Sequence, residues 1–78
     1  MSRGVDHMDR RMLQQHLALA ERHVAEGRQH VSRQRQIIFE LRRDGHDTTM
    51  ARGLLEQFKD TLKLHIEDRD RLKAEVSR

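Results

Sequence analysis

Apolar residues recur at helical spacing along two long segments, and the pattern is interrupted once, at residues 44–47. Before the break, apolar positions follow one another in steps of three and four from Leu13 to Leu41. After it, they do the same from Ala51 to Val76. Such spacing places one apolar stripe along each of two α-helices. Because the break is short, the sequence predicts an all-α fold, an antiparallel two-helix hairpin of coiled-coil type.

The break and its flanks set the expected boundaries of the helices. The first helix is expected over about 6–44, the turn over 45–47 and the second helix over about 48–76. Gly45 is the expected stop of the first helix, because glycine readily adopts the left-handed conformation that follows many helix C-termini. The sequence contains no proline, which would break either helix.

Short polar residues near the helix starts are candidate caps. Asp6 is the expected N-cap of the first helix, and Asp9 is expected in its first turn, where a carboxylate favours the helix dipole. Asp47 or Thr48 is expected to cap the second helix.

Composition narrows the class of protein. The 78 residues suffice for one domain spanning 1–78, with 37% charged residues and a formal net charge of +3. There is no cysteine, which excludes disulfides and thiolate metal sites. No apolar run approaches the ~18 residues that span a bilayer, and no signal-peptide core follows Met1. We therefore expect a cytoplasmic protein without membrane association.

The apolar seams predict which residues hold the hairpin together and mediate association between copies. These residues are Leu17, Val24, Val31, Ile38, Leu41, Leu55, Phe58, Leu62 and Leu72. Three polar residues, Gln34, His65 and Arg69, fall on the same seams. Polar seam residues often fix register at some cost in stability, and this is the role we expect for Gln34 and Arg69.

A turn centred at Gly45–His46 also predicts the register, in which residues whose numbers sum to about 92 lie opposite one another. Gly27 would then face His65, and Gln34 would face Phe58. Gly27 leaves room for an imidazole, so His65 is either a packed, hydrogen-bonded histidine or a pH-sensitive or ligand-binding core position. Protonation of a buried, neutral His65 would destabilise the bundle.

Several apolar residues lie beside or beyond the seams. They are Met8, Met12, Leu13, Ile37, Leu54 and Ile66. A hairpin shields only one side of each helix, so a second copy would bury these residues better. The sequence predicts a homodimer, most simply an antiparallel four-helix bundle, with a monomeric hairpin as the alternative. The exposed faces also leave open an unidentified protein partner.

The other histidines do not predict a metal site. His16, His23 and His30 recur every seven residues, which separates neighbours by about 10 Å along the axis, whereas ligands on one helix are usually three or four residues apart. A polar row that shields the seam is the simpler interpretation. We expect no metal ligands and no cofactor, and a histidine-dependent metal-binding protein remains an alternative function.

A basic run on the first helix is the second alternative. The basic excess of this helix lies in Arg28, Arg33, Arg35, Arg42 and Arg43. The run Arg33-Gln34-Arg35 with Arg42-Arg43 could contact phosphates, but no aromatic residue is interleaved for base stacking. A solvated helix face is favoured, and a nucleic-acid partner is disfavoured. No nucleophile with a base and no glycine-rich phosphate loop is visible, so no catalytic residue is expected and the protein is not expected to be an enzyme. The expected role is that of a structural or protein-interaction module.

Four stretches carry a resemblance to known proteins: residues 17–27, residues 44–48, and the downstream segments Leu64-His65-Ile66 and Asp68–Leu72. They resemble a group of short bacterial proteins of unknown function, over roughly residues 15–75. The resemblance implies a helical hairpin. It implies no activity, and no catalytic or binding residue is carried over from it.

Overall fold

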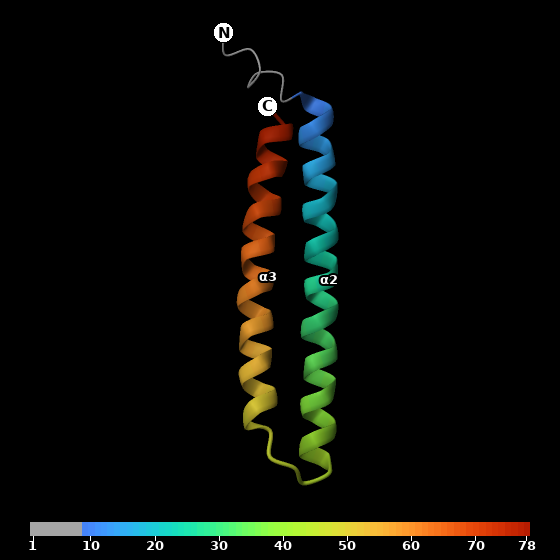
Figure 1. The fold of residues 1–78 in the computed structure, drawn as a ribbon, viewed down its shortest axis with the longest axis vertical. Helices are drawn as coiled ribbons and strands as arrows, with labels where there is room; N and C mark the ends of the chain where they lie inside the picture. The colour runs from blue at the N-terminus through green and yellow to red at the C-terminus, as the bar shows by residue number, and fades with distance from the viewer. Residues whose placement is uncertain (1–8) are drawn as a thin grey trace.

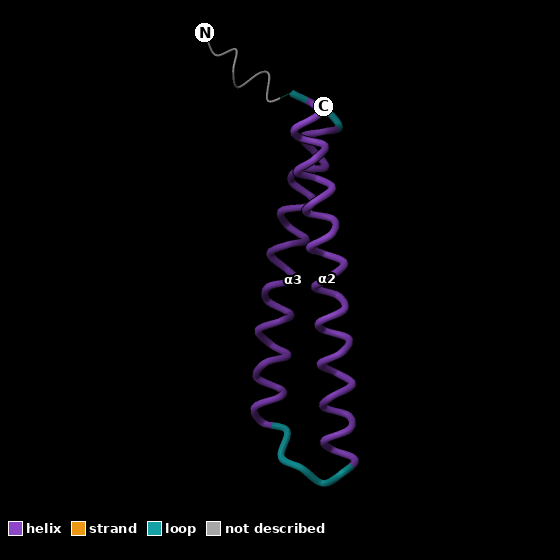
Figure 2. The backbone as a smooth tube through the Cα atoms, turned by 45° about the vertical axis from the view of Figure 1, so that its right-hand side comes forward, coloured by secondary structure: helices purple, strands orange, loops and turns teal. Residues whose placement is uncertain are grey.

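The computed structural model describes residues 9–78 and shows two long helices packed side by side in an antiparallel hairpin (Figure 1). Helix α2 spans Arg10–Arg43 and helix α3 spans Thr49–Val76. The molecule is a rod with extents of 63 × 16 × 15 Å, and a second view shows the helices following each other along their whole length (Figure 2). The predicted all-α hairpin is confirmed. Within the described part of the chain, neither helix is long and apolar enough to cross a membrane.

Asp9 caps the N-terminus of α2. Its backbone is extended, and its carboxylate accepts a hydrogen bond from the amide of Met12 at 3.1 Å. The expectation that Asp9 lies in the first turn is therefore wrong, because its side chain satisfies one of the free amides at the helix start. Asp6, the expected cap, lies outside the described residues. At the same end of the rod, the Arg10 guanidinium donates to the Val76 carbonyl at 3.0 Å and joins the two helices.

The end of α2 is a complete Schellman motif around Gly45. Gly45 has a φ of +78°, its amide donates to the Arg42 carbonyl at 3.1 Å, and the His46 amide donates to the Leu41 carbonyl at 2.8 Å. The left-handed conformation places both amides against carbonyls that the helix leaves free. The predicted role of Gly45 as the stop of the first helix is confirmed.

Substitutions at Gly45 and Gly53 distinguish the effect of backbone conformation on stability from the effect of helix propensity. We expect Gly45→Ala to lower the free energy of unfolding by about 1 kcal/mol, because a Cβ is strained at positive φ. We expect Gly53→Ala to raise it by about 1 kcal/mol, because Gly53 is helical and a Cβ there meets no atom within 4 Å. Urea denaturation followed by circular dichroism measures the free energy of unfolding of both variants. Equal effects of the two substitutions would contradict the left-handed conformation assigned to Gly45.

The start of α3 is stabilised by Asp47. Its carboxylate accepts hydrogen bonds from the Thr49 amide at 2.9 Å and the Thr49 hydroxyl at 2.8 Å. Thr48 occupies the N-cap position, yet its side chain makes no capping bond. Two hydrogen bonds lower the pKa of the Asp47 carboxyl. The larger effect comes from the Thr49 amide and the smaller from the Thr49 hydroxyl.

This lowered pKa predicts a pH-dependent contribution of Asp47 to stability. A carboxyl whose pKa is lower in the folded state stabilises the fold above its unfolded pKa and loses that contribution as the pH falls through its folded pKa. Asp47→Ala is therefore expected to lower the melting temperature at neutral pH, and the difference from the unsubstituted chain should shrink in acid. Asp60→Ala is the control, since Asp60 accepts no side-chain hydrogen bond among the described residues. A difference that stays constant across the titration would refute the role of the charge.

The core is thin and lies along the line where the helices meet. Its buried residues are Ala20, Val24, Gly27, Val31, Gln34 and Ile38 from α2 and Leu72 from α3. Other predicted seam residues are half-buried, namely Leu17, Leu41, Leu55, Phe58, Leu62, His65 and Arg69. No large side chain among residues 9–78 is fully buried. All predicted seam residues therefore lie at least partly shielded, but a single hairpin encloses none of the large ones completely.

The register differs from the prediction by about one helical turn. Gly27 lies against Leu62 rather than His65, and Gln34 bonds to the Ala51 carbonyl rather than facing Phe58. Contacting pairs have residue numbers that sum to 85–89 instead of 92. The cause is the non-helical stretch 46–48, which runs back alongside the end of α2 before α3 begins (Figure 1). Non-helical residues cover more length than the ~1.5 Å per residue of a helix, and α3 is displaced accordingly.

Candidate interaction surfaces

One side of the hairpin carries a row of residues from each helix at alternating steps of three and four, and we call it the histidine face. It comprises Met12, His16, Leu19, His23, Glu26, His30, Arg33 and Ile37 of α2 and Met50, Leu54, Gln57, Thr61, Leu64 and Asp68 of α3. This spacing puts each row on one side of its helix. Two shallow pockets contain residues of both rows, so the two rows share one face of the molecule.

The central pocket of the histidine face is formed around Gly27 and has a volume of about 260 Å³. It is lined by His23, Glu26, Gly27, His30, Phe58, Thr61 and His65. The rings of His23 and His65 lie 5.0 Å apart, centre to centre, and those of His30 and Phe58 lie 5.5 Å apart and nearly parallel. His65 therefore contacts another histidine across the seam, and Gly27 opens the space beside the pair.

The histidines of the described residues do not form a metal centre. Among residues 9–78, no group of three or more His, Asp or Glu side chains is placed to hold a metal ion. The ring of His23 lies against that of His65. The ring contacts make His23, His30 and His65 part of the packing between the helices, which lends no support to the metal-binding alternative.

The end of the histidine face nearest the turn is apolar. A second pocket of about 570 Å³ is lined by Ile37, Met50 and Leu54 together with Gln34, Ala51, Gly53 and Gln57. Six large apolar side chains in the described part of the chain are exposed, and five of them, all but Phe39, belong to the histidine face. Met50 and Leu64 are the most exposed of the five, at 89% and 64%.

The polar seam residues have identifiable partners. Gln34 is buried, and its side-chain amide donates to the Ala51 carbonyl of α3 at 2.9 Å. That bond ties the two helices together near the turn and satisfies a buried polar group. Arg69 is half-buried and pairs with the neighbouring carboxylate of Asp70 at 2.7 Å, so it makes no ion pair with α2 among the described residues.

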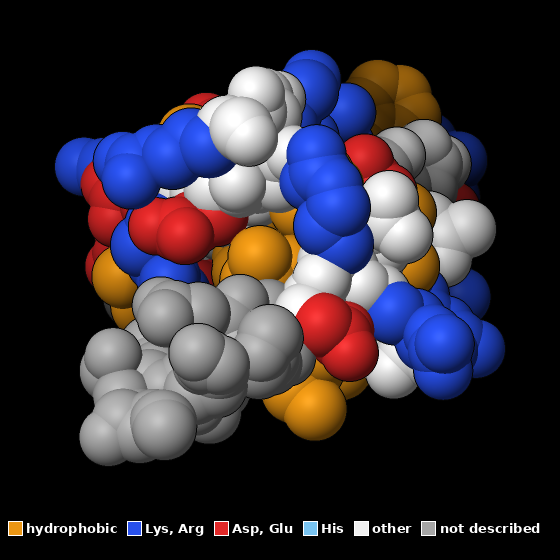
Figure 3. All heavy atoms as spheres, turned by 90° about the horizontal axis from the view of Figure 1, so that it is seen from above, with side chains coloured by type: hydrophobic (Ala, Val, Ile, Leu, Met, Phe, Trp, Pro, Cys, Tyr) orange, Lys and Arg blue, Asp and Glu red, His pale blue; other side chains and the backbone are white. Residues whose placement is uncertain are grey.

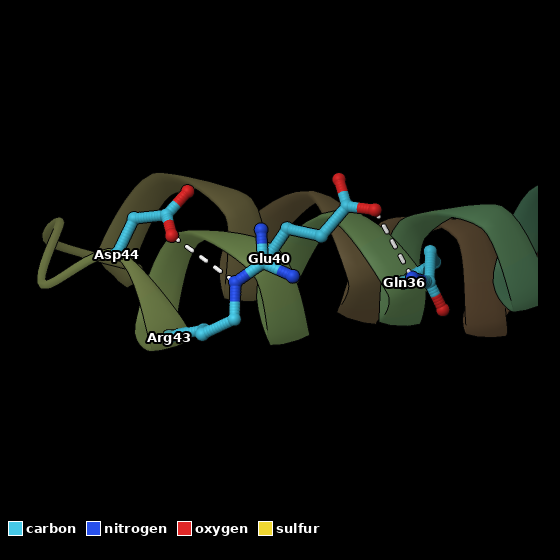
Figure 4. A network of polar contacts seen from close by, with 4 residues as sticks. All are labelled: Gln36, Glu40, Arg43 and Asp44. Carbon is cyan, nitrogen blue, oxygen red and sulfur yellow. Dashed lines mark hydrogen bonds and ion pairs between the residues drawn. The ribbon is translucent and has the colours of Figure 1, made fainter.

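The arginines of α2 do not form the single basic face that the sequence suggested. Arg28 and Arg35 line a groove on the side opposite the histidine face, whereas Arg33 belongs to the histidine face itself. Arg43 pairs with Asp44 at 3.1 Å at the end of α2, beside the hydrogen bond from Gln36 to Glu40 (Figure 4). Viewed along the rod, Lys and Arg side chains stand at several points of the rim rather than on one side (Figure 3). A continuous phosphate-binding surface is therefore not formed by these arginines.

Comparison with protein-family models, curated proteins and solved structures finds no match for this chain.

Proposed function

We propose that the chain is a non-enzymatic structural module that self-associates, with two hairpins packing their histidine faces together as an antiparallel four-helix bundle. The observation that carries this proposal is the gathering of exposed apolar side chains on one face, with Met12, Leu19, Met50, Leu54 and Leu64 all exposed there. Large exposed apolar residues collected on one side of a small protein mark an interaction surface.

The thin core supports the same proposal. The half-buried positions, such as Ile37 and Phe58, are shielded on one side only. A second hairpin laid on the histidine face would bury their open side, as facing helices do in four-helix bundles. Small domains often gain stability from such association, because their own core is limited by their surface-to-volume ratio.

Charge favours the histidine face over the opposite one as the self-association surface. The histidine face carries one arginine and two acidic residues, Arg33, Glu26 and Asp68. The opposite groove carries Arg28, Arg35, Lys59 and Lys63 with only Glu67 as an acid. A two-fold interface brings the same patch of both copies together, so the cationic groove would repel itself.

Light scattering coupled to size exclusion tests the proposal. We expect the unsubstituted chain to be a dimer at high micromolar concentration and Leu64→Glu to be monomeric. Leu64 is 64% exposed in the hairpin, so its substitution should leave the helices intact, which circular dichroism checks. Phe39→Glu is the matched control, because Phe39 is 59% exposed but lies on the opposite side. A monomeric unsubstituted chain, or equal dissociation by Phe39→Glu, would overturn the proposal.

A further inference from the structure

A second groove runs between the helices on the side opposite the histidine face, and we call it the basic groove. Its volume is about 940 Å³, larger than that of either pocket on the histidine face. It is lined by Arg28, Val31, Ser32, Arg35, Gln36, Phe39, Lys59, Leu62, Lys63, Ile66 and Glu67.

The groove has an apolar floor and two cationic walls. Val31 of α2 and Leu62 and Ile66 of α3 come from the seam and its edge, and they are buried or half-buried. Arg28 and Arg35 stand one above the other on α2, seven residues apart, and Lys59 and Lys63 stand one turn apart on α3. Residues at these spacings share one side of a helix. Each helix therefore contributes one pair of cations to the rim.

Most of this positive charge is not neutralised within the hairpin. Lys59 pairs with Glu56 at 3.3 Å, in an exposed contact. Arg28, Arg35 and Lys63 make no ion pair with any residue of the range 9–78. Phe39 projects at one end of the groove with 59% of its surface exposed. The groove therefore presents an apolar strip and an aromatic ring between two sets of largely free cations.

We infer that the basic groove binds a short acidic amphipathic α-helix of a partner protein. An apolar stripe on that helix would pack on Val31, Leu62 and Ile66, and Asp or Glu residues flanking the stripe would meet the cations of both walls. Helices recognised in this way place apolar anchors at positions i, i+4 and i+7. The α2 wall from Arg28 to Phe39 corresponds to a bound helix of about three turns.

The apolar floor distinguishes this partner from a nucleic acid. A phosphate backbone would engage the cations but leave the floor uncovered, and base stacking uses aromatic side chains, of which the groove offers only Phe39. A second copy of this chain is disfavoured because its own groove carries the same four cations. The inference does not depend on self-association, because a monomeric hairpin and a dimer joined through the histidine face both leave this groove free.

A binding measurement with a designed peptide tests the inference. The probe is a fluorescent peptide with leucines at helical spacing flanked by glutamates, and the reference is a scrambled peptide of the same composition. Fluorescence anisotropy at low salt should show binding of the amphipathic peptide only, with helix gained on binding. Equal binding of both peptides, or tighter binding of a short DNA duplex than of the peptide, would overturn the inference.

Two charge-reversal variants locate the site. Arg35→Glu is expected to weaken peptide binding by roughly tenfold, because an attraction in the groove becomes a repulsion. Arg22→Glu changes the net charge equally, but Arg22 is exposed and lines none of the three pockets. The affinity of this variant for the peptide should therefore stay within about twofold of that of the unsubstituted chain. Phe39→Ser should also weaken binding and leave the dimer intact. Equal losses in Arg35→Glu and Arg22→Glu would show that only net charge matters and would overturn the inference.

Discussion

Replacing Ile38 with alanine is expected to lower the free energy of unfolding by about 2–4 kcal/mol. Ile38 is only 7% exposed and is one of the few buried aliphatic side chains in the hairpin. Its truncation removes buried methyl groups and leaves a gap that two rigid helices cannot easily close. Urea denaturation followed by circular dichroism, at one fixed protein concentration, measures the loss.

Ile37→Ala provides the matched control for this prediction. Ile37 is the same residue type in the same helix, but it is half-buried and faces outward into the histidine face. Both substitutions are best measured in the Leu64→Glu background, in which dissociation of the proposed dimer does not contribute to the transition. A loss for Ile37→Ala as large as that for Ile38→Ala would contradict the assigned core.

Gly27→Leu is expected to destabilise the hairpin by about 1–3 kcal/mol through overpacking. A Cβ at Gly27 would already lie 3.0 Å from Cδ1, 3.5 Å from Cβ and 3.7 Å from Cα of Leu62. A leucine needs still more space, so the helices must separate or Leu62 must leave its position. Thermal melting and urea denaturation both report the change.

A control and a second substitution isolate the Gly27–Leu62 contact. Gly53→Leu should be neutral or stabilising, because no atom lies within 4 Å of a Cβ at Gly53 and leucine favours the helix over glycine. Adding Leu62→Ala to Gly27→Leu should restore part of the stability, since the effects of substituting two residues in contact do not simply add. Full additivity of the two substitutions would show that the helices do not meet at this point.

The sequence alone was sufficient to predict the architecture, because the evidence for it is local. Apolar spacing predicts both helices. Gly45 is the one residue in the range 9–78 that has a positive φ. The seam residues follow from the same spacing, and Val24, Val31, Ile38 and Leu72 are buried as expected. The cap of α3 was predicted as Asp47 or Thr48, and the hydrogen bonds of Asp47 decide between the two side chains.

The register could not be predicted in the same way, because it depends on how far the chain travels between the helices. The path of residues 46–48 displaces α3 along its axis by about one turn. The apolar spacing within each helix is the same with or without this displacement, so it cannot predict it. The basic groove was missed because its residues come from both helices. Arg35 and Lys63 lie far apart in sequence, and the spacing within either helix alone does not show that they line one groove.

The hairpin connects its two helices at one end only, which has a consequence for how it folds and opens. The Gln34–Ala51 hydrogen bond closes a loop with a sequence separation of 17, whereas the Arg10–Val76 bond closes one of 66. Closing a short loop costs less entropy than closing a long one, and a hairpin offers contacts of every intermediate span. We therefore expect the helices to zip together from Gly45 outward and to fray first at Arg10 and Val76. In amide hydrogen exchange, protection should rise from that open end toward the turn.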